Sequence, residues 1–429
     1  MQQRLLDNSL ERTFYKSWKG ERCGGIDFWP ALELIINGKC DQKCSYCYIT
    51  NYGKDLFPAG SQEDQKILDN TVMIMEWLKR NNLKPRIDLF SAEIFSQEIG
   101  FQVLDLIYQL GWEGMYVGIP SNFNFLFDEE KTNRVLSTHK KFFSNNKKLY
   151  LSCSVDGKYM EDNRPIRDGK LRDDSFYKKL FSTYRILKQG YHPMLYSEGI
   201  ENCKDNFLWF QDNFIKYDIP YPNLYLLEVR NKEWTIEQSR QLGEFIEFLV
   251  EWLQDKAGSD EGLIDAIFKD RAFNILSSVL LTNGRGMSCS VQATQVVRLG
   301  DLSIYPCHRT MYPSFKLAQM KVVDSKITGI ESVNYPLYLA TKFADLRNFP
   351  YCVACDIKEF CVGGCYGAQY ETTGDLFTPI PTVCIMEHAK TMSVLRTLKY
   401  KTNIWERVKR SIGERKNSAI ITLEKRDWL

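Results

Sequence analysis

The chain has 429 residues, a formal net charge of +2 and 13 cysteines. This length allows two or three domains with buried cores, and the near-neutral charge gives no basic footprint for nucleic acid. No apolar run is long enough to span a membrane and the N-terminus lacks a signal-peptide pattern, so we expect a cytoplasmic protein without nucleic-acid or membrane partners. In such a protein, this many cysteines favour metal ligation over disulfides.

Apolar runs and amphipathic patterns alternate along the first half of the chain. Strands are expected at residues 31–36, 87–90, 115–119, 149–153, 192–196 and 224–227. Helical patterns begin at Ser61 and cover 99–110 and 176–187, the last of them stopping before Gly190 as before a C-terminal glycine. Six strand–helix alternations predict an α/β fold with a parallel sheet, a partial (β/α)6 barrel over residues 30–230, whose site belongs at the carboxyl ends of the strands.

The rest of the chain divides by composition into four segments. A helix capped at Thr235, with Gln238 in the capping-box position, opens the first segment after the barrel. From Lys390 onward, eleven Lys or Arg stand against four Asp or Glu, which indicates either a solvated basic helix or a dock for an acidic peptide. The expected segments are an N-terminal extension (1–29), a helical bridge (231–286), a cysteine-rich domain (287–390) and a basic helical segment (391–429).

Three cysteines follow shortly after the first expected strand, residues 31–36. Cys40, Cys44 and Cys47 form a C-x3-C-x2-C motif. Three thiolates on one short loop can each bind one iron of a cubane cluster and leave the fourth iron open. Zinc is the weaker alternative, because it requires a fourth ligand nearby and the next cysteine is Cys153.

Seven further cysteines lie in the last third of the chain. Their core has the spacing C-x2-C-x5-C-x3-C, with one cysteine after it and a pair before it. A zinc ribbon is the alternative for the first two of the core, but seven cysteines exceed the four ligands of one tetrahedral zinc. The seven are Cys289, Cys307, Cys352, Cys355, Cys361, Cys365 and Cys384.

The first motif, with Tyr46 directly before its third cysteine, resembles that of the radical S-adenosylmethionine (SAM) enzymes. The second resembles the SPASM domain of radical SAM enzymes that modify peptides and proteins. The resemblance implies a radical SAM oxidoreductase acting on a peptide, similar to the maturases of ribosomally made peptides and to anaerobic sulfatase maturases. It also implies SAM and three [4Fe-4S] clusters, with a 5′-deoxyadenosyl radical that abstracts a substrate hydrogen.

The resemblance divides the cysteines among three clusters. The inner auxiliary set lacks the upstream fourth cysteine of several relatives, so either it keeps an open iron for a substrate thiolate, or His308, water or Cys203 completes it. Cys23, Cys153 and Cys203 are otherwise expected to be buried apolar thiols. The sets are Cys40, Cys44 and Cys47 for SAM, Cys352, Cys355, Cys361 and Cys384 for the outer auxiliary cluster, and Cys289, Cys307 and Cys365 for the inner one.

Four residues are expected to contact SAM. Tyr46 would press its ring against the adenine. Ala92 and Glu93 stand where the family carries Gly-Gly-Glu, whose backbone meets the amino group of SAM. Ser154 opens the run Ser154-Val155-Asp156-Gly157 and would meet the ribose, although Asp-Gly is also an ordinary turn pair. A nearby arginine, Arg164, matches a frequent family residue.

His308 follows Cys307, in the position where sulfatase maturases carry a proton-accepting aspartate. A histidine can act as a base near neutral pH, and a hydrogen bond supporting the cluster is an equal alternative. The expected activity is a thioether or carbon–carbon cross-link in a ribosomally made precursor peptide. The alternatives are side-chain oxidation without cross-linking (as in sulfatase maturation or alcohol dehydrogenation), epimerisation, and a zinc-rich binding protein.

The expected partners are the precursor peptide and a flavodoxin- or ferredoxin-type electron donor. An acidic leader on the precursor would suit the basic C-terminal segment. The 39 residues before Cys40 are too few for a separate leader-binding domain, so leader recognition is expected to be internal or supplied by a partner.

Overall fold

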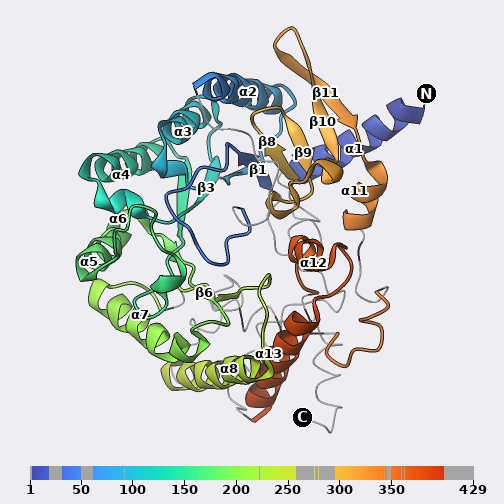
Figure 1. Ribbon diagram of the computed structural model, residues 1–429. Coiled ribbons are helices and arrows are strands. Elements are labelled where there is room, and N and C mark those ends of the chain that lie inside the picture. Colours follow the sequence, from blue (N-terminus) through green and yellow to red (C-terminus); the bar gives the residue numbers. More distant parts are fainter. Residues whose placement is uncertain are drawn as a thin grey trace. The chain divides into compact units, whose positions relative to one another are not determined.

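In the computed structural model the chain forms two compact units, each built from segments far apart in the sequence (Figure 1). The first unit comprises Met1–Ser154, Pro165–Gln189 and Ser290–Phe343, and the second comprises Val155–Arg164, Gly190–Cys289 and Ala344–Leu429. Residues of the predicted barrel and of the predicted cysteine-rich domain therefore occur in both units. The structure describes residues 2–18, 31–49, 61–90, 92–221, 223–257, 275, 279, 295–342, 344, 349–358, 360–361 and 363–400.

The first unit is built on a mixed sheet. Its strands are β1 (Ala31–Ile35), β2 (Arg86–Leu89), β3 (Tyr116–Ser121), β4 (Lys148–Cys153), β8 (Gln295–Arg298), β9 (Ser303–Tyr305), β10 (Ala318–Val323) and β11 (Lys326–Ser332). Within this unit they lie in the order β11-β10-β9-β8-β1-β2-β3-β4. The pairs from β8 through β1 to β4 are parallel, and those from β8 to β11 are antiparallel. The predicted α/β class with a parallel sheet is confirmed.

Strand β1 is the centre of this sheet. It pairs with β2 on one side and with β8 on the other, and all five of its residues are buried. A parallel strand buried on both faces is expected to be almost continuously apolar. Glu33 is the exception, with only 7% of its surface exposed. The pairing with β8 brings a segment from the cysteine-rich region beside the first strand of the chain.

Helices of the first unit pack against parallel and antiparallel strands of its sheet (Figure 1). Acidic residues in the first turn of α2 and basic residues in its last turn complement the helix dipole. The helix predicted over 176–187 is divided into α5 and α6, and Lys188 ends it in the left-handed conformation (φ 49°) where a glycine was expected. The helices are α1 (Gln2–Trp18), α2 (Ser61–Arg80), α3 (Glu98–Leu110), α4 (Glu129–Ser144), α5 (Asp174–Ser182), α6 (Tyr184–Leu187) and α11 (Tyr335–Lys342).

The second unit is mainly helical. Its elements are β5 (Gly190–Tyr191), β6 (Met194–Leu195), α7 (Cys203–Tyr217), β7 (Leu227–Glu228), α8 (Ile236–Ala257), α12 (Tyr366–Thr373) and α13 (Pro381–Tyr400). The predicted capping box before α8 is confirmed, since Thr235 and Gln238 exchange hydrogen bonds of 3.0 and 3.1 Å. Helix α8 packs along α13, and a Cβ at Gly243 would lie only 2.7 Å from Ser393. The strands predicted over 192–196 and 224–227 are reduced to the two-residue pair β6–β7.

No helix in the described ranges has the length and apolar character that crossing a membrane requires. Residues 391–400 of the predicted basic helical segment belong to α13, and the rest of that segment lies outside the described residues, as do Cys23 and Cys289.

Candidate functional site

The cysteine loop (residues 40–47) follows β1 and is held by a second segment of the first unit, residues 165–172, which we call the strap. Arg167 of the strap donates from Nε to the carbonyl of Cys40 at 3.1 Å. Its backbone N–H donates to the carbonyl of Asp41 at 2.9 Å. The three thiols of the loop are half-buried and form no disulfide. The strap therefore fixes the backbone of the loop around its first cysteine.

A buried polar network fixes the side chain of Asp41, the residue directly after Cys40 in the loop. The two carboxylate oxygens of Asp41 accept hydrogen bonds from the side-chain amides of Asn122 (2.6 Å) and Asn124 (3.0 Å). Arg172, only 8% exposed, donates to the Asn122 carbonyl (2.7 Å) and to the Asn124 side-chain oxygen (2.8 Å). A buried cation thus holds the backbone of Asn122 and the side-chain amide of Asn124, the two residues that donate to Asp41. Our sequence analysis missed this network, and the only signal for it was an aspartate directly after the first ligand.

Three predicted cluster ligands accept a backbone hydrogen bond at sulfur. In each case the donor is the second residue after the cysteine, at 3.4 Å for Cys40, 3.4 Å for Cys307 and 3.3 Å for Cys361. Such N–H···S bonds favour the charged thiolate, the form that binds iron. The local backbone at these cysteines therefore suits metal ligation.

The environment of Cys40 also suits a bound cation. Burial raises the pKa of its thiol, and the nearby charge of Glu93 raises it further. A positive metal centre would reverse this preference and deprotonate the thiol. Among the described residues no three His, Cys, Asp or Glu side chains converge as ligands of a single ion, whereas in a cubane each thiolate binds a different iron.

Glu93 joins the carboxyl ends of β2 and β3. Its carboxylate accepts hydrogen bonds from the backbone N–H groups of Asn122 (2.6 Å) and Phe95 (3.1 Å) and from the Ser121 hydroxyl (2.9 Å). Its own N–H donates to the carbonyl of Lys39 at 3.1 Å. Burial raises the pKa of Glu93 to about 7 despite these donors. The carboxylate is therefore occupied by groups of the protein itself.

The other residues predicted to contact SAM lie near the same strand ends. Tyr46 is buried at 7% exposure, and Ala92 is half-buried after β2. Ser154 follows β4, and its N–H donates to the carbonyl of Ser121 at 2.7 Å. Their contacts with SAM stay a prediction.

The Asp-Gly pair after β4 is a buried anchor of the second unit. The Asp156 side chain is 0% exposed, accepts a hydrogen bond from the Met194 N–H at 2.9 Å and pairs with Arg164 at 2.8 Å. Gly157 has φ +96°, and a Cβ there would lie 2.5 Å from the Asn206 side chain. These contacts require glycine and distinguish the pair from an ordinary surface turn.

His308 is held by two strands of the first unit. Its Nδ1 atom lies 2.8 Å from Glu33 of β1, and its ring stacks on Phe90 after β2, with centroids 3.9 Å apart and planes at 13°. Asp88 pairs with Glu33 across β1 and β2, and burial raises the pKa of Asp88 to about 6. Glu33 was missed, although a lone carboxylate inside an apolar strand was a signal for it.

A cavity of about 970 Å³ in the second unit is lined by the outer cysteine set. Cys352, Cys355, Cys361 and Cys384 all line it, together with Cys365. Burial raises the pKa of Cys361 to about 12 and that of Cys384 to about 11. A cubane held by four thiolates requires four cysteines around one space, and the binding of one cluster by these four residues stays a prediction.

The cysteines of the predicted inner set do not belong to one unit. Cys307 belongs to the first unit, Cys365 to the second, and Cys289 lies outside the described residues, so the inner set stays a prediction. Cys153 and Cys203 are buried at 0% and 2% exposure, as predicted for apolar thiols. The Cys203 sulfur contacts that of Met160 at 3.7 Å.

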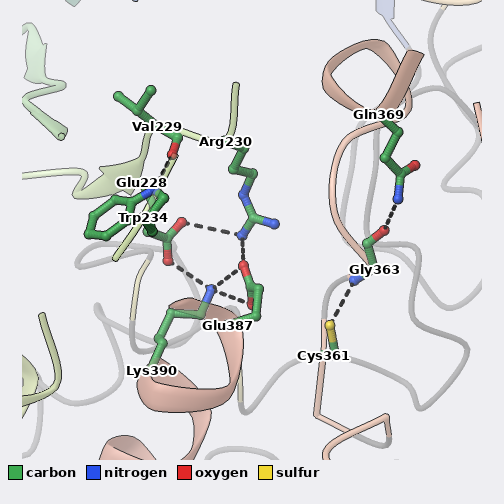
Figure 2. A network of polar contacts seen from close by, with 9 residues as sticks. All are labelled: Glu228, Val229, Arg230, Trp234, Cys361, Gly363, Gln369, Glu387 and Lys390. Carbon is green, nitrogen blue, oxygen red and sulfur yellow. Dashed lines mark hydrogen bonds and ion pairs between the residues drawn. The ribbon is translucent and has the colours of Figure 1, made fainter. Parts of the chain in front are cut away.

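Four charged side chains, which we call the ion quartet, connect the segment of β7 to α13 (Figure 2); Glu228, Glu387 and Lys390 are buried and Arg230 is half-buried. Lys390 lies 2.7 Å from Glu228 and 2.9 Å from Glu387, while Arg230 lies 3.3 Å from Glu228 and also pairs with Glu387. Burial opposes the charge of Glu228, but Lys390 and Arg230 outweigh it and lower its pKa to about 2. Arg230 and Glu387 also line the cysteine cavity.

Comparisons with known proteins establish the fold. No family model matches the sequence, and no curated protein does either. The solved structure of anSMEcpe, an anaerobic sulfatase maturase, with bound AdoMet has a TM-score of 0.57 at 14% identity, covering 89% of this chain and 98% of that one. The chain has the fold of this maturase. A second structure of anSMEcpe, with AdoMet and the Cp18Cys peptide, has a TM-score of 0.56 at 15% identity, covering 87% and 100%. The predicted resemblance is confirmed at the level of the fold.

Proposed function

We propose that this protein is a radical SAM enzyme that oxidatively modifies a ribosomally made precursor peptide and installs a thioether or carbon–carbon cross-link. The observation that carries the proposal is the C-x3-C-x2-C loop at the carboxyl end of β1, secured there by the strap and the Asp41 network. The carboxyl ends of parallel strands are the usual place of an active site in such folds. The peptide bound in the anSMEcpe structure supports a peptide as the substrate.

The proposal assigns each cofactor to residues of this chain. When bound, the [4Fe-4S] cluster and SAM supply the 5′-deoxyadenosyl radical that removes a hydrogen atom from the substrate. Tyr46, Ala92, Glu93 and Ser154 surround SAM in this proposal. The ligands are Cys40, Cys44 and Cys47 for the SAM cluster, Cys352, Cys355, Cys361 and Cys384 for the outer auxiliary cluster, and Cys289, Cys307 and Cys365 for the inner one.

His308 is the proposed base. Cross-linking removes two hydrogens from the peptide: the 5′-deoxyadenosyl radical would take one as an atom, and the other would leave as a proton while an auxiliary cluster accepts its electron. A carboxylate only accepts hydrogen bonds, so Nδ1 of His308 carries a proton toward Glu33 and Nε2 is the atom that takes the substrate proton. The stacked ring of Phe90 limits the rotation of the imidazole and keeps Nε2 in one direction.

A second candidate is two-electron oxidation of a side chain without cross-linking. The likeness to anSMEcpe extends over 98% of that chain, so this protein has a scaffold of the same extent as a sulfatase maturase. The sulfatase maturases carry an aspartate at the position of His308. This protein therefore differs from them at the residue that would accept the substrate proton.

Mass spectrometry distinguishes these candidates. Anaerobically reconstituted protein is incubated with SAM, dithionite and each short peptide found by a search of the neighbouring reading frames, and 5′-deoxyadenosine is measured together with peptide mass. Both oxidations remove two hydrogens, but a cross-link suppresses backbone fragments inside its ring in tandem spectra. A full fragment series with the same mass loss would favour side-chain oxidation, and an unchanged mass would favour epimerisation. Colourless protein that retains zinc and no iron would refute the whole proposal.

A further inference from the structure

Arg230 has a buried hydrogen-bond donor at the wall of the cysteine cavity. Its Nη2 atom pairs with Glu228 and Glu387, but its Nη1 atom is buried and has no hydrogen-bond partner among the described residues. A buried donor left without an acceptor destabilises the folded protein. Such an atom requires an explanation, and an acceptor inside the cavity would supply one.

The ion quartet brings charges of both signs to the wall of the cysteine cavity. Arg230 and Glu387 line this cavity together with the proposed ligands Cys361 and Cys384. Glu228 and Lys390 complete the quartet through ion pairs with Arg230 and Glu387. In Figure 2 the quartet is drawn together with Cys361, whose sulfur accepts the Gly363 N–H. The quartet therefore presents one cation and one anion to the cavity that the proposed ligands line.

We propose that Arg230 donates a hydrogen bond from Nη1 to a sulfur of the cluster held by the outer cysteine set, and that the ion quartet sets the reduction potential of that cluster. This inference rests on the proposed function, which places a cluster at those cysteines. Reduction adds one negative charge to the cluster, so a cationic donor stabilises the reduced form and raises the potential, while a carboxylate lowers it. Arg230 and Glu387 should therefore have opposite effects.

The test uses the full chain with only the outer set able to hold iron, that is, with Cys40, Cys44, Cys47, Cys289 and Cys307 replaced by alanine. The midpoint potential of the one-electron couple is measured by titration with dithionite, followed by electron paramagnetic resonance. Arg230→Gln should lower it by about 59 mV, a tenfold change in the equilibrium constant of a one-electron couple. Glu387→Gln should raise it by a similar amount. Arg230→Lys, which keeps the charge but not the planar fork, should give a smaller decrease.

Arg240→Gln is the matched control. Arg240 lines the same cavity, but its side chain is 56% exposed and pairs with Glu237, so solvent screens its charge and the potential should not move. Shifts of the same sign in Arg230→Gln and Glu387→Gln would indicate loosening of the unit and overturn the inference, as would unshifted potentials in iron-containing protein. If Arg230→Gln does not fold, the opposite shifts expected of Glu387→Gln and Arg230→Lys decide the matter. Absence of iron from the background protein would instead refute the outer ligand set, and this inference with it.

Discussion

The Nδ1 atom of His308 lies 2.8 Å from a carboxylate oxygen of Glu33. Glu33 is a buried member of β1, and the cysteine loop begins five residues after that strand ends. The same strand therefore positions the proposed base and delivers the proposed cluster ligands. A hydrogen-bonded carboxylate fixes which ring nitrogen carries the proton, and this gives the first prediction.

Replacing His308 with glutamine should abolish proton transfer without disturbing cofactor binding. Removal of a positioned base costs roughly a hundredfold to ten-thousandfold in rate, so product should fall by that factor while iron content and SAM cleavage stay near those of the unchanged protein. Deoxyadenosine would then accumulate without product. Glu33→Gln, which keeps the imidazole but not its carboxylate, should give a smaller decrease. A loss of about four irons from His308→Gln would instead identify a ligand, and an unchanged product rate would identify a bystander.

Replacing Cys40, Cys44 and Cys47 together with alanine tests the ligand assignment. With three [4Fe-4S] clusters the reconstituted protein should hold about twelve irons, and the triple variant about eight. SAM cleavage should disappear because no cluster with an open iron for SAM remains. Iron analysis and deoxyadenosine assays measure both. A triple variant with the full iron content would contradict the assignment.

Arg172→Gln should weaken iron binding by the cysteine loop without weakening iron binding at the auxiliary cysteines. The change removes the cation that holds Asn122 and Asn124, the two residues that donate to Asp41, and hydrogen bonds to charged groups contribute about 1.5–3 kcal/mol. We expect lower iron occupancy at the SAM cluster and slower SAM cleavage, with auxiliary iron retained. Arg134→Gln is the control, because its pair with Glu98 is 37% and 60% exposed and contributes about 1 kcal/mol or less. Equal effects of the two variants would show that the network does not hold the loop.

His192 should make stability depend on pH. Burial, and then the charge of Arg164, lowers the pKa of His192 from 6.5 to about 4. The unfolded chain takes up the proton below pH 6.5 while the folded chain resists it. The contribution of His192 to the free energy of unfolding should therefore be at its maximum above pH 6.5. It should fall by about 2–3 kcal/mol as the pH falls from 6.5 to 4.

The test is His192→Phe, which preserves the stacking on Tyr225 (centroids 4.6 Å apart) and removes the titration. Denaturant unfolding at several pH values should show that the protein with His192 loses stability relative to the variant as the pH falls toward 4. A constant difference over that range would refute the shifted pKa.

Hydrophobic periodicity was sufficient to predict the long elements. The helix from Ser61 and the cap of α8 at Thr235 are where the pattern placed them, because both depend on contacts within a few residues. The short strands β6 and β7 were overestimated, since their two-residue pairing is decided by neighbours that periodicity does not reveal.

The site was predictable only in part. The cysteines were found because their spacing is local, and His308 because it stands beside one of them. Glu33, Asn122, Asn124 and Arg172 were not found, because their roles depend on strand ends that meet only in the folded chain. The ion quartet joins residues more than 150 positions apart, and no local pattern indicates it.

The parallel pairing of β1 with β8 bears on how this protein can be divided into fragments. Leu32 and Leu34 are matched with Gln295 and Val297, so a fragment ending before residue 290 would present one whole side of an apolar central strand as a bare edge. Exposed edges of that kind pair with other molecules and aggregate. The N-terminal cysteine motif is therefore not a transferable cassette: a chimera that takes residues 1–289 from this protein must also bring a strand that fits against β1.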